Sequence, residues 1–271
     1  MVTHPVESRT ILRLQLATKQ QARVDDVVSV DFPLHVIMNG LHCITMTCTP
    51  DRLEDLVTGY LLSEGIVDKV SQVAQIRLSD GKCEVELAPE LNLQKRLGQT
   101  SPFYRVVTSE CGGVFPSPFA KLMDRLSPPK LTDVTPFKAS AIECAVGELN
   151  REASIYRQTG GVHAASICDR SGRLEHLAED VGRHNAVDKV IGRCARSGGR
   201  FEDMFLVSTG RLTGEIIMKA ARVRIPVVAS ISAVLSSGID AAEKTGLTAI
   251  GFVRGRRMNI YSHPERIQTS G

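Results

Sequence analysis

The stretch that decides the fold runs from Thr159 to Gly192 and reads TGGVHAASICDRSGRLEHLAEDVGRHNAVDKVIG. Its segments Val162–Asp169 and Leu174–Ala178 have the length and composition of short strands, and the RSGR sequence between them is typical of a turn. The segment Asn185–Arg196 repeats apolar pairs at the spacing of one helix face. Two strands that lead directly into a helix indicate a layered α/β fold, in which the joint Glu179–Asn185 faces a ligand.

Apolar runs of strand length alternate with helical patterns in the rest of the second half. The expected strands are Met204–Ser208, Val227–Ser230 and Leu247–Val253, and the expected helices are Thr213–Val223 and Ala233–Lys244. Alternation of this kind predicts βαβ units and a parallel region of sheet. A long helix opened by Thr135-Pro136 precedes them. We therefore expect residues 132–271 to form a three-layer α/β/α domain.

The first half, residues 1–131, is expected to be a separate β-rich domain. Its expected strands are Ile11–Leu16, Val27–Met38, Leu41–Thr47, Val73–Leu78, Cys83–Leu87 and Phe103–Val107, and its expected helices are one capped by Thr49-Pro50 that stops at Gly65 and a short one over Phe119–Leu126. Asn39-Gly40 and Asp80-Gly81 are strong hairpin signals. The linker Ser127–Lys130 places the domain boundary at 131/132.

Composition excludes several classes of protein. Of the 271 residues, 42% are hydrophobic and 23% charged, which is ordinary for a soluble globular protein. The formal net charge of +3 is too small to indicate a nucleic-acid binder, and no apolar run approaches the ~20 residues of a membrane span. Seven scattered cysteines, an odd number, favour a reducing compartment. We expect a cytoplasmic protein that binds neither nucleic acid nor membrane.

Cys111 is the one cysteine in an expected loop with glycines directly behind it, Gly112-Gly113. A cysteine attacks as the thiolate, and its unperturbed pKa is roughly 8.5. Glu110 opposes deprotonation, whereas accessible loop amides and Arg105 favour it. Spacing alone leaves two readings open: a turn cysteine without a role, or a nucleophile.

The histidines do not indicate a metal centre. A structural zinc site needs closely spaced Cys/His pairs, and the sequence has no C-x-x-C. Zinc deaminases need H-x-E and P-C-x-x-C, whereas His163 is followed by Ala-Ala and His184 by Asn-Ala. We therefore expect no metal ligands.

A basic run follows the last expected strand. Arg254, Arg256 and Arg257 lie in Phe252–Arg257, at the edge where the strands before Ser208–Arg211 and Ser230–Ser232 also end. Ligands of open α/β sheets bind outside these ends, and guanidinium groups suit phosphates. The alternative is a solvated basic edge; the position favours a nucleotide or pyrophosphate.

Four charged residues surround the joint between strand and helix: Asp180, Arg183, His184 and Asp188. An Asp–Arg pair that braces the turn and direct contact with a ligand are both open readings.

Four runs together resemble one known family. They read TGGVHAASICD, AEDVGRHNAVDKVIG, STGRLTGEIIMKAA and AEKTGLTAIGFVRGRRMNIYSHPERI. In this order they look like the FdhD family of formate dehydrogenase accessory sulfurtransferases, over roughly Cys111 to Ile267. The resemblance implies a second domain similar to cytidine deaminases but without their zinc.

The resemblance also implies a function. A family member takes sulfur from a cysteine desulfurase as a cysteine persulfide and passes it to the molybdenum (or tungsten) cofactor of formate dehydrogenase. Cys111 matches the persulfide cysteine. Phe252, Val253, Arg254, Gly255, Arg256 and Arg257 match the run that binds bis-molybdopterin guanine dinucleotide, where GDP-like nucleotides also fit.

The cysteine loop departs from the family pattern C-G-x-C-G, because Val114 stands at the second cysteine. A paired thiol could discharge a persulfide by forming a disulfide, whereas Cys111 cannot do so locally. We therefore weigh two functions: sulfur transfer through Cys111, and a non-catalytic chaperone that binds the same cofactor and docks formate dehydrogenase. A homodimer is the default assembly.

Overall fold

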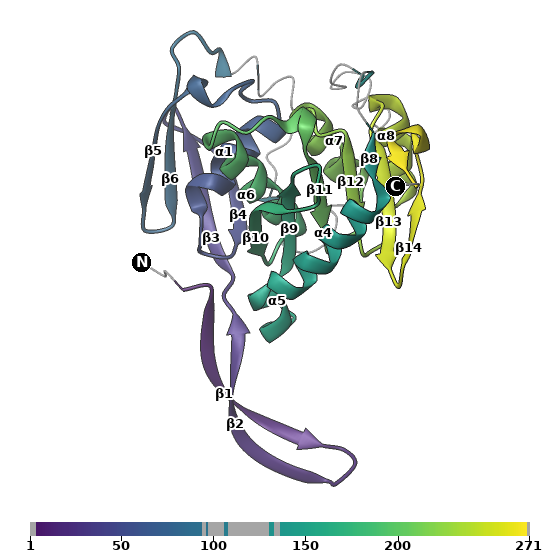
Figure 1. Cartoon of the computed structure of the whole chain (residues 1–271). Helices are drawn as coiled ribbons and strands as arrows, with labels where there is room; N and C mark the ends of the chain where they lie inside the picture. The colour runs from purple at the N-terminus through teal and green to yellow at the C-terminus, as the bar shows by residue number, and fades with distance from the viewer. Residues whose placement is uncertain (1–3, 94–95, 97–105, 108–129, 133–135, 270–271) are drawn as a thin grey trace.

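The computed structural model describes residues 4–93, 96, 106–107, 130–132 and 136–269. These residues form a layered α/β body from which a two-stranded arm projects (Figure 1). The strands are β1 (Val6–Gln15), β2 (Gln20–Ser29), β3 (Phe32–Met38), β4 (Leu41–Cys48), β5 (Val73–Ser79), β6 (Lys82–Leu87), β7 (Val106–Val107), β8 (Phe137–Lys138), β9 (His163–Cys168), β10 (Leu174–Asp180), β11 (Phe205–Ser208), β12 (Val227–Ser230), β13 (Thr248–Arg254), β14 (Arg257–Ile260) and β15 (Ile267–Gln268). The helices are α1 (Leu53–Ser63), α4 (Ala139–Glu152), α5 (Ser154–Thr159), α6 (Arg183–Arg196), α7 (Gly214–Arg222) and α8 (Ser236–Thr245).

The predicted three-layer arrangement of the second half is confirmed. Its six-stranded sheet has the order β10-β9-β11-β12-β13-β14, with β11, β12 and β13 parallel. Successive side chains of a strand face opposite sides of a sheet. Phe205 and Val207 of β11 therefore pack in the core with α4, whereas Leu206 packs in the core with α6, α7 and α8.

The first half contains a five-stranded sheet of order β5-β6-β3-β4-β7. Both predicted hairpins are present. Asn39 and Gly40 have φ of 47° and 79°, and Asp80 and Gly81 have 38° and 77°. Two consecutive residues with positive φ match the right-handed twist of the flanking strands, so these turns fix the register of β3 with β4 and of β5 with β6.

Two helix starts were predicted wrongly. Helix α1 begins at Leu53 after Arg52, and Thr49 does not cap it. Thr49 instead contacts the second half: its N–H donates to Asp180 (3.0 Å), and its hydroxyl accepts from the Val181 N–H (3.0 Å). Helix α4 begins at Ala139 because the two residues before it pair with β15 as strand β8.

The other differences are smaller. The expected strand Val27–Met38 is two strands, β2 and β3, and the long helix after Pro136 is broken at Ala153 into α4 and α5. Strand β10 extends to Asp180, and β14 was not predicted because it is short and half-exposed. Of the expected strand Phe103–Val107, only Val106–Val107 is described, and the expected helix Phe119–Leu126 lies outside the described residues.

The two halves share one core through the contact between α1 and α6. A Cβ on Gly59 would lie 1.8 Å from the carbonyl oxygen of Asp188, and a Cβ on Gly192 would lie 1.9 Å from that of Asp55. The two helices therefore touch backbone to backbone, and residues before and after 131 belong to the same buried cluster. The division into domains at 131/132 stays a prediction. No helix in the described part of the chain is long and apolar enough to span a membrane.

Candidate functional site at the strand-tip edge

The carboxyl ends of the parallel strands meet at one edge of the six-stranded sheet, which we call the strand-tip edge. Ser208, the last residue of β11, pairs with Ser230, the last of β12, and also with Ala165 of β9. Because β9 runs antiparallel to β11 and to β10, the first residue of β9, His163, lies at this edge opposite Asp180, the last of β10. The edge thus brings together the joint, the loops after β11 and β12, and the start of the basic run.

Buried hydroxyl groups hold the loops after β11 and β12 together. The Ser208 hydroxyl accepts from the Gly210 N–H (3.0 Å), and the Ser230 hydroxyl donates to the Gly210 carbonyl (2.7 Å). The Thr209 hydroxyl accepts from the N–H of Ala164 (3.0 Å). Each of these three hydrogen bonds joins a side chain to the backbone. The conformation of the loops is therefore fixed without a bound ligand.

Positive charge surrounds His163 at this edge. Its ring lies 3.4 Å from the Thr209 hydroxyl. Burial, followed by the nearby positive charges of Arg183, His184 and Arg211, lowers the pKa of His163. The imidazole is therefore held neutral at neutral pH by an environment that favours a negative charge.

The first turn of α6 supplies two of these groups, Arg183 and His184. Arg183 is 6% exposed and packs over the loop after β11, where a Cβ on Gly210 would lie 2.9 Å from the Arg183 Cβ. His184 Nε2 lies 3.0 Å from a carboxylate oxygen of Glu215, in the first turn of α7. Helix N-termini attract anions through their free N–H groups and the helix dipole. The N-termini of α6 and α7 therefore add to the positive potential of the guanidinium groups at this edge.

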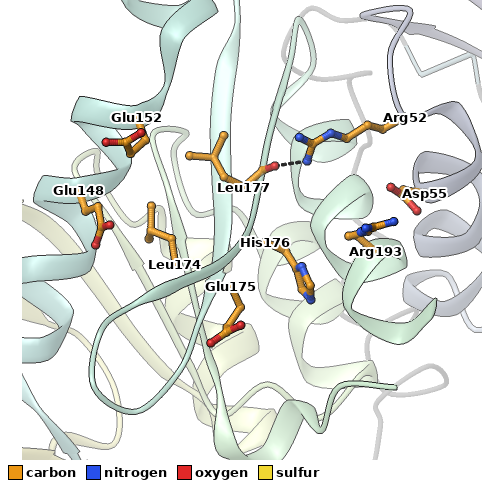
Figure 2. A pocket seen from close by; sticks show the side chains of 9 residues that line it. All are labelled: Arg52, Asp55, Glu148, Glu152, Leu174, Glu175, His176, Leu177 and Arg193. Carbon is orange, nitrogen blue, oxygen red and sulfur yellow. Dashed lines mark hydrogen bonds between the residues drawn. The ribbon is translucent and has the colours of Figure 1, made fainter. Parts of the chain in front are cut away.

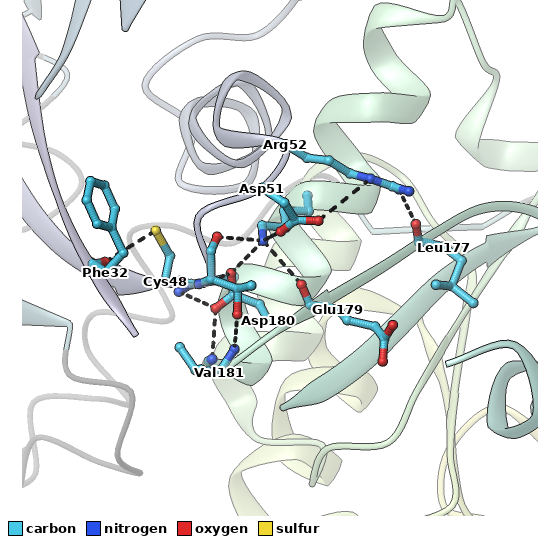
Figure 3. A network of polar contacts seen from close by, with 12 residues as sticks. Phe32, Cys48, Asp51, Arg52, Leu177, Glu179, Asp180 and Val181 are labelled. Atoms are coloured by element: carbon cyan, nitrogen blue, oxygen red, sulfur yellow. Dashed lines mark hydrogen bonds and ion pairs between the residues drawn. The ribbon is translucent and has the colours of Figure 1, made fainter. Parts of the chain in front are cut away.

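Asp180 is the centre of a buried polar network (Figure 3). Its carboxylate accepts from the N–H groups of Thr49 (3.0 Å) and Gly182 (2.8 Å) and from Asn185 Nδ2 (2.9 Å), and it lies 2.8 Å from Lys189 Nζ. Burial disfavours the ammonium of Lys189, but the carboxylates of Asp180 and Asp51 outweigh it and raise the pKa of this lysine. With four donors, Asp180 is a structural anion that fixes the joint against the first half.

A second buried ion pair involves Asp188, the residue directly before Lys189 on α6. Asp188 Oδ2 is 2.8 Å from Lys219 Nζ, and the Ser63 hydroxyl donates to Asp188 (2.6 Å). Glu64 completes the group at 2.9 Å from the same ammonium. Asp180 and Asp188, for which bracing and ligand contact were both open, thus pair with lysines and brace the fold.

The basic run forms a hairpin rather than a strand-end loop. Strand β13 continues to Arg254, Gly255 and Arg256 make the turn with φ of 60° and 61°, and β14 starts at Arg257. Phe252 also has a positive φ, 53°, and its N–H donates to the Ser232 carbonyl (2.9 Å). Positive φ is rare for a bulky side chain, so this contact with the loop after β12 holds an unusual backbone in place.

The hairpin gathers three guanidinium groups. Arg254 and Arg257 are paired directly across the two strands, although like charges opposite each other are destabilising. Arg254 also lies over the Phe252 ring, 5.4 Å from its centroid, while Val253 is buried. Arg254, Gly255, Arg256 and Arg257 are all exposed. Opposed arginines on a fixed hairpin suit a multiply charged anion such as a pyrophosphate.

The structure separates the described cysteines into two groups. Cys48, Cys83, Cys168 and Cys194 are buried, and Cys43 is half-buried. Burial raises the pKa of Cys43 and Cys48, that of Cys83 and Cys168 to about 12, and that of Cys194 to about 11. Cys144, on α4, is exposed. Cys111 and its loop lie outside the described residues.

A pocket lies at the start of the outer strand β10, at the end opposite Asp180 (Figure 2). Its volume is about 690 Å³, and its lining is charged on both sides of the strand. It is lined by Arg52, Asp55, Glu148, Glu152, Leu174, Glu175, His176, Leu177 and Arg193. Arg52 donates to the Leu177 carbonyl and so covers part of the free strand edge. This groove is remote from the strand-tip edge.

Comparison with known proteins identifies the family. The model of the FdhD/NarQ family matches residues 29–268. The chain belongs to the FdhD/NarQ family. The sulfur carrier protein FdhD of Methanothermobacter thermautotrophicus is 37% identical over 92% of this chain and 94% of its own length. The protein of the same name from Bacillus subtilis is 34% identical over 91% and 92%.

A solved structure has the same fold. It is described as a formate dehydrogenase accessory protein from Desulfotalea psychrophila, and it superposes with a TM-score of 0.75 at 24% identity. The match covers 98% of this chain and all of the other. At that identity the likeness establishes the fold alone.

The sequence missed the residues that join the two halves. Thr49-Pro50 has the composition of a helix cap, and the local sequence does not predict the contacts of Lys189 and Gly192. No local signal marked them: Asp188 and Lys189 fall between the apolar pairs of the helix, at positions that normally face solvent.

Proposed function

We propose that this chain is a sulfur carrier that serves formate dehydrogenase. Membership of the FdhD/NarQ family and the sulfur-carrier names of its relatives support this role. The accessory-protein description of the structural relative supports formate dehydrogenase as the recipient. In this role Cys111 carries the sulfur as a persulfide.

Burial of the other thiols supports the choice of Cys111. A sulfur acceptor must be an accessible thiolate, and burial disfavours the thiolates of Cys43, Cys48, Cys83, Cys168 and Cys194. Among the described cysteines only Cys144 is exposed, and it lies on the outer face of α4, away from the strand-tip edge. Cys144 therefore serves as the matched control for Cys111.

The transfer of sulfur through Cys111 requires two partner thiols, one that donates the sulfur and one that supplies electrons for its release. The Cys111 thiolate attacks the terminal sulfur of a cysteine desulfurase persulfide, and the desulfurase thiolate leaves. Release of that sulfur as sulfide requires two electrons from another thiolate, which then ends in a disulfide with Cys111. Because Val114 occupies the second position of the loop motif, this reducing thiol comes from elsewhere.

The molybdenum cofactor binds at the arginine hairpin, which is the β13–β14 turn with Arg254, Arg256 and Arg257. The opposed pair Arg254 and Arg257 is the observation that carries this assignment, because an anion between the two removes their repulsion. The basic cluster around His163 lies at the same edge, three strands along the sheet from β13. Two separate anion sites at one edge suit an extended substrate with several phosphates, such as bis-molybdopterin guanine dinucleotide.

The alternative is a chaperone that binds the same cofactor without moving sulfur, and Val114 is the observation that favours it. Cells that lack their own sulfur carrier test the choice through formate dehydrogenase activity. We expect this chain and its Cys144→Ala variant to restore activity, and Cys111→Ala to fail. Full activity with Cys111→Ala would support the chaperone instead.

A further inference from the structure

Strand β10 is an outer strand of the six-stranded sheet, and one of its edges faces away from β9. The Leu177 carbonyl accepts from Arg52 on this edge. Further along, the Glu179 carbonyl accepts from Lys189 Nζ (3.2 Å). In an antiparallel ladder the N–H and C=O of one residue point to the same side, so the Leu177 N–H also faces outward. Side chains therefore occupy positions where an added strand would donate, and such an edge can accept one.

The start of this edge lies in the pocket that Figure 2 shows, which we call the β10 groove. Its volume of about 690 Å³ is within the range of pockets that hold a ligand. Leu174 and Leu177 are half-buried and form the apolar part of its lining. The register of β10 with β9 shifts between Leu174 and His176, so the pairing passes over Glu175. The groove thus combines an outer strand edge with an apolar floor.

Carboxylates line the α4 side of the β10 groove (Figure 2). Glu148 and Glu152 are four residues apart and therefore lie on one face of the helix. Like charges at this spacing repel each other, and among the described residues neither carboxylate has an ion-pair or hydrogen-bond partner. A basic side chain placed between the two would relieve this repulsion.

The opposite side of the β10 groove is basic (Figure 2). Burial, followed by the nearby charge of Arg193, lowers the pKa of His176, so the positive charge of this side comes from Arg193 and Arg52. Arg193 is exposed, and no carboxylate in the described part of the chain pairs with its guanidinium. The carboxylates of Asp55 and Glu175 are already paired with other arginines. This side therefore favours an acidic side chain.

A strand added to β10 would meet both sides at once, because successive side chains of a strand point in opposite directions. In this mode of recognition, backbone hydrogen bonds supply affinity and the alternate side chains supply specificity. We propose that the β10 groove binds an extended segment of a partner protein in which basic and acidic side chains alternate. The groove lies at the end of β10 opposite the strand-tip edge, so the bound partner leaves that edge open.

Fluorescence anisotropy with a labelled, capped peptide of alternating Lys and Glu tests this proposal. We expect the native chain to bind this peptide at least tenfold more tightly than all-Lys or all-Glu peptides of the same length, because each of these places like charges together. Glu148→Lys should weaken binding of the alternating peptide at least tenfold and strengthen binding of the all-Glu peptide. Glu143→Lys is the matched control, because Glu143 is exposed on α4 but does not line the groove.

The reciprocal substitution tests the basic side of the groove. Arg193→Glu should weaken binding of the alternating peptide and strengthen binding of the all-Lys peptide. Arg200→Glu makes the same change of net charge outside the groove, and we expect it to retain the native preference. No measurable binding of the alternating peptide, or equal effects of the groove variants and their controls, would overturn the proposal.

Hydrogen exchange locates the bound peptide without any substitution. The amides of Glu175 and Leu177 should exchange more slowly when the alternating peptide is bound, and protection at the strand-tip edge instead would contradict the proposal. Equal competition by free lysine and glutamate would show that the groove takes small amino acids. A change of self-association in Glu148→Lys would show that a second copy covers it. Either result makes the proposal wrong. None of these readouts involves Cys111, so their failure leaves the proposed function standing.

Discussion

The ammonium of Lys189 lies 2.8 Å from the carboxylate of Asp180, and both side chains are fully buried. The pair joins the middle of α6 to the end of β10, and through Thr49 and Asp51 it reaches the first half of the chain. The joint that faces the strand-tip edge is thus held from both sides, and its rigidity keeps Arg183 and His184 in place.

Lys189→Met should destabilise the protein by about 3–5 kcal/mol, since it leaves buried carboxylates without their counter-charge. Urea unfolding measures this change, with the exposed Lys82→Met as control. A loss similar to that of the control would show that the pair is not the connection described above.

Gly59→Ala tests the contact between α1 and α6. In most helix interiors this substitution stabilises by up to about 1 kcal/mol. Here the new Cβ would meet the backbone of Asp188, so we expect a loss of several kcal/mol instead. Gly147→Ala in α4 is the matched control, because its Cβ would meet only the end of Arg151 at 3.7 Å. Thermal unfolding should shift in opposite directions for the two variants. Shifts of the same sign and size would contradict the close approach.

The elements that the sequence predicted correctly are those whose signals are local. Asn39-Gly40 and Asp80-Gly81 determine their turns through the backbone of two residues, and the apolar spacing of α6 needs no partner. The wrong predictions depend on contacts distant in sequence. Thr49-Pro50 has the composition of a cap, but Thr49 bonds to Asp180 and Val181.

The same distinction between local signals and distant contacts applies to the candidate site. The strand-tip edge and its three arginines could be placed from the alternation of strands and helices. The hairpin that opposes Arg254 and Arg257 could not, because β14 is short and its pairing depends on the bulge after Gly251. The buried lysines 189 and 219 have their partners on segments far away in sequence, and periodicity contains no information on them.

The double variant Arg254→Ala, Arg256→Ala should weaken GDP binding at least tenfold. Each charge-assisted hydrogen bond contributes roughly 1.5–3 kcal/mol, and tenfold corresponds to about 1.4 kcal/mol. Both side chains are exposed, so the fold should be retained. Calorimetry with GDP measures the change. The control is Arg200→Ala with Arg224→Ala, which removes two exposed arginines just before β11 and β12, at the amino ends of the strands. Equal affinities for the two double variants would place the nucleotide elsewhere.

The central claim is that Cys111 carries sulfur, and intact-mass measurement tests it most directly. The chain is incubated with a cysteine desulfurase and cysteine, and its mass is recorded without reductant. We predict a gain of one sulfur atom in the native chain and in Cys144→Ala, and no gain in Cys111→Ala. A native chain that gains no sulfur, or a Cys111→Ala variant that gains it equally well, would contradict the account.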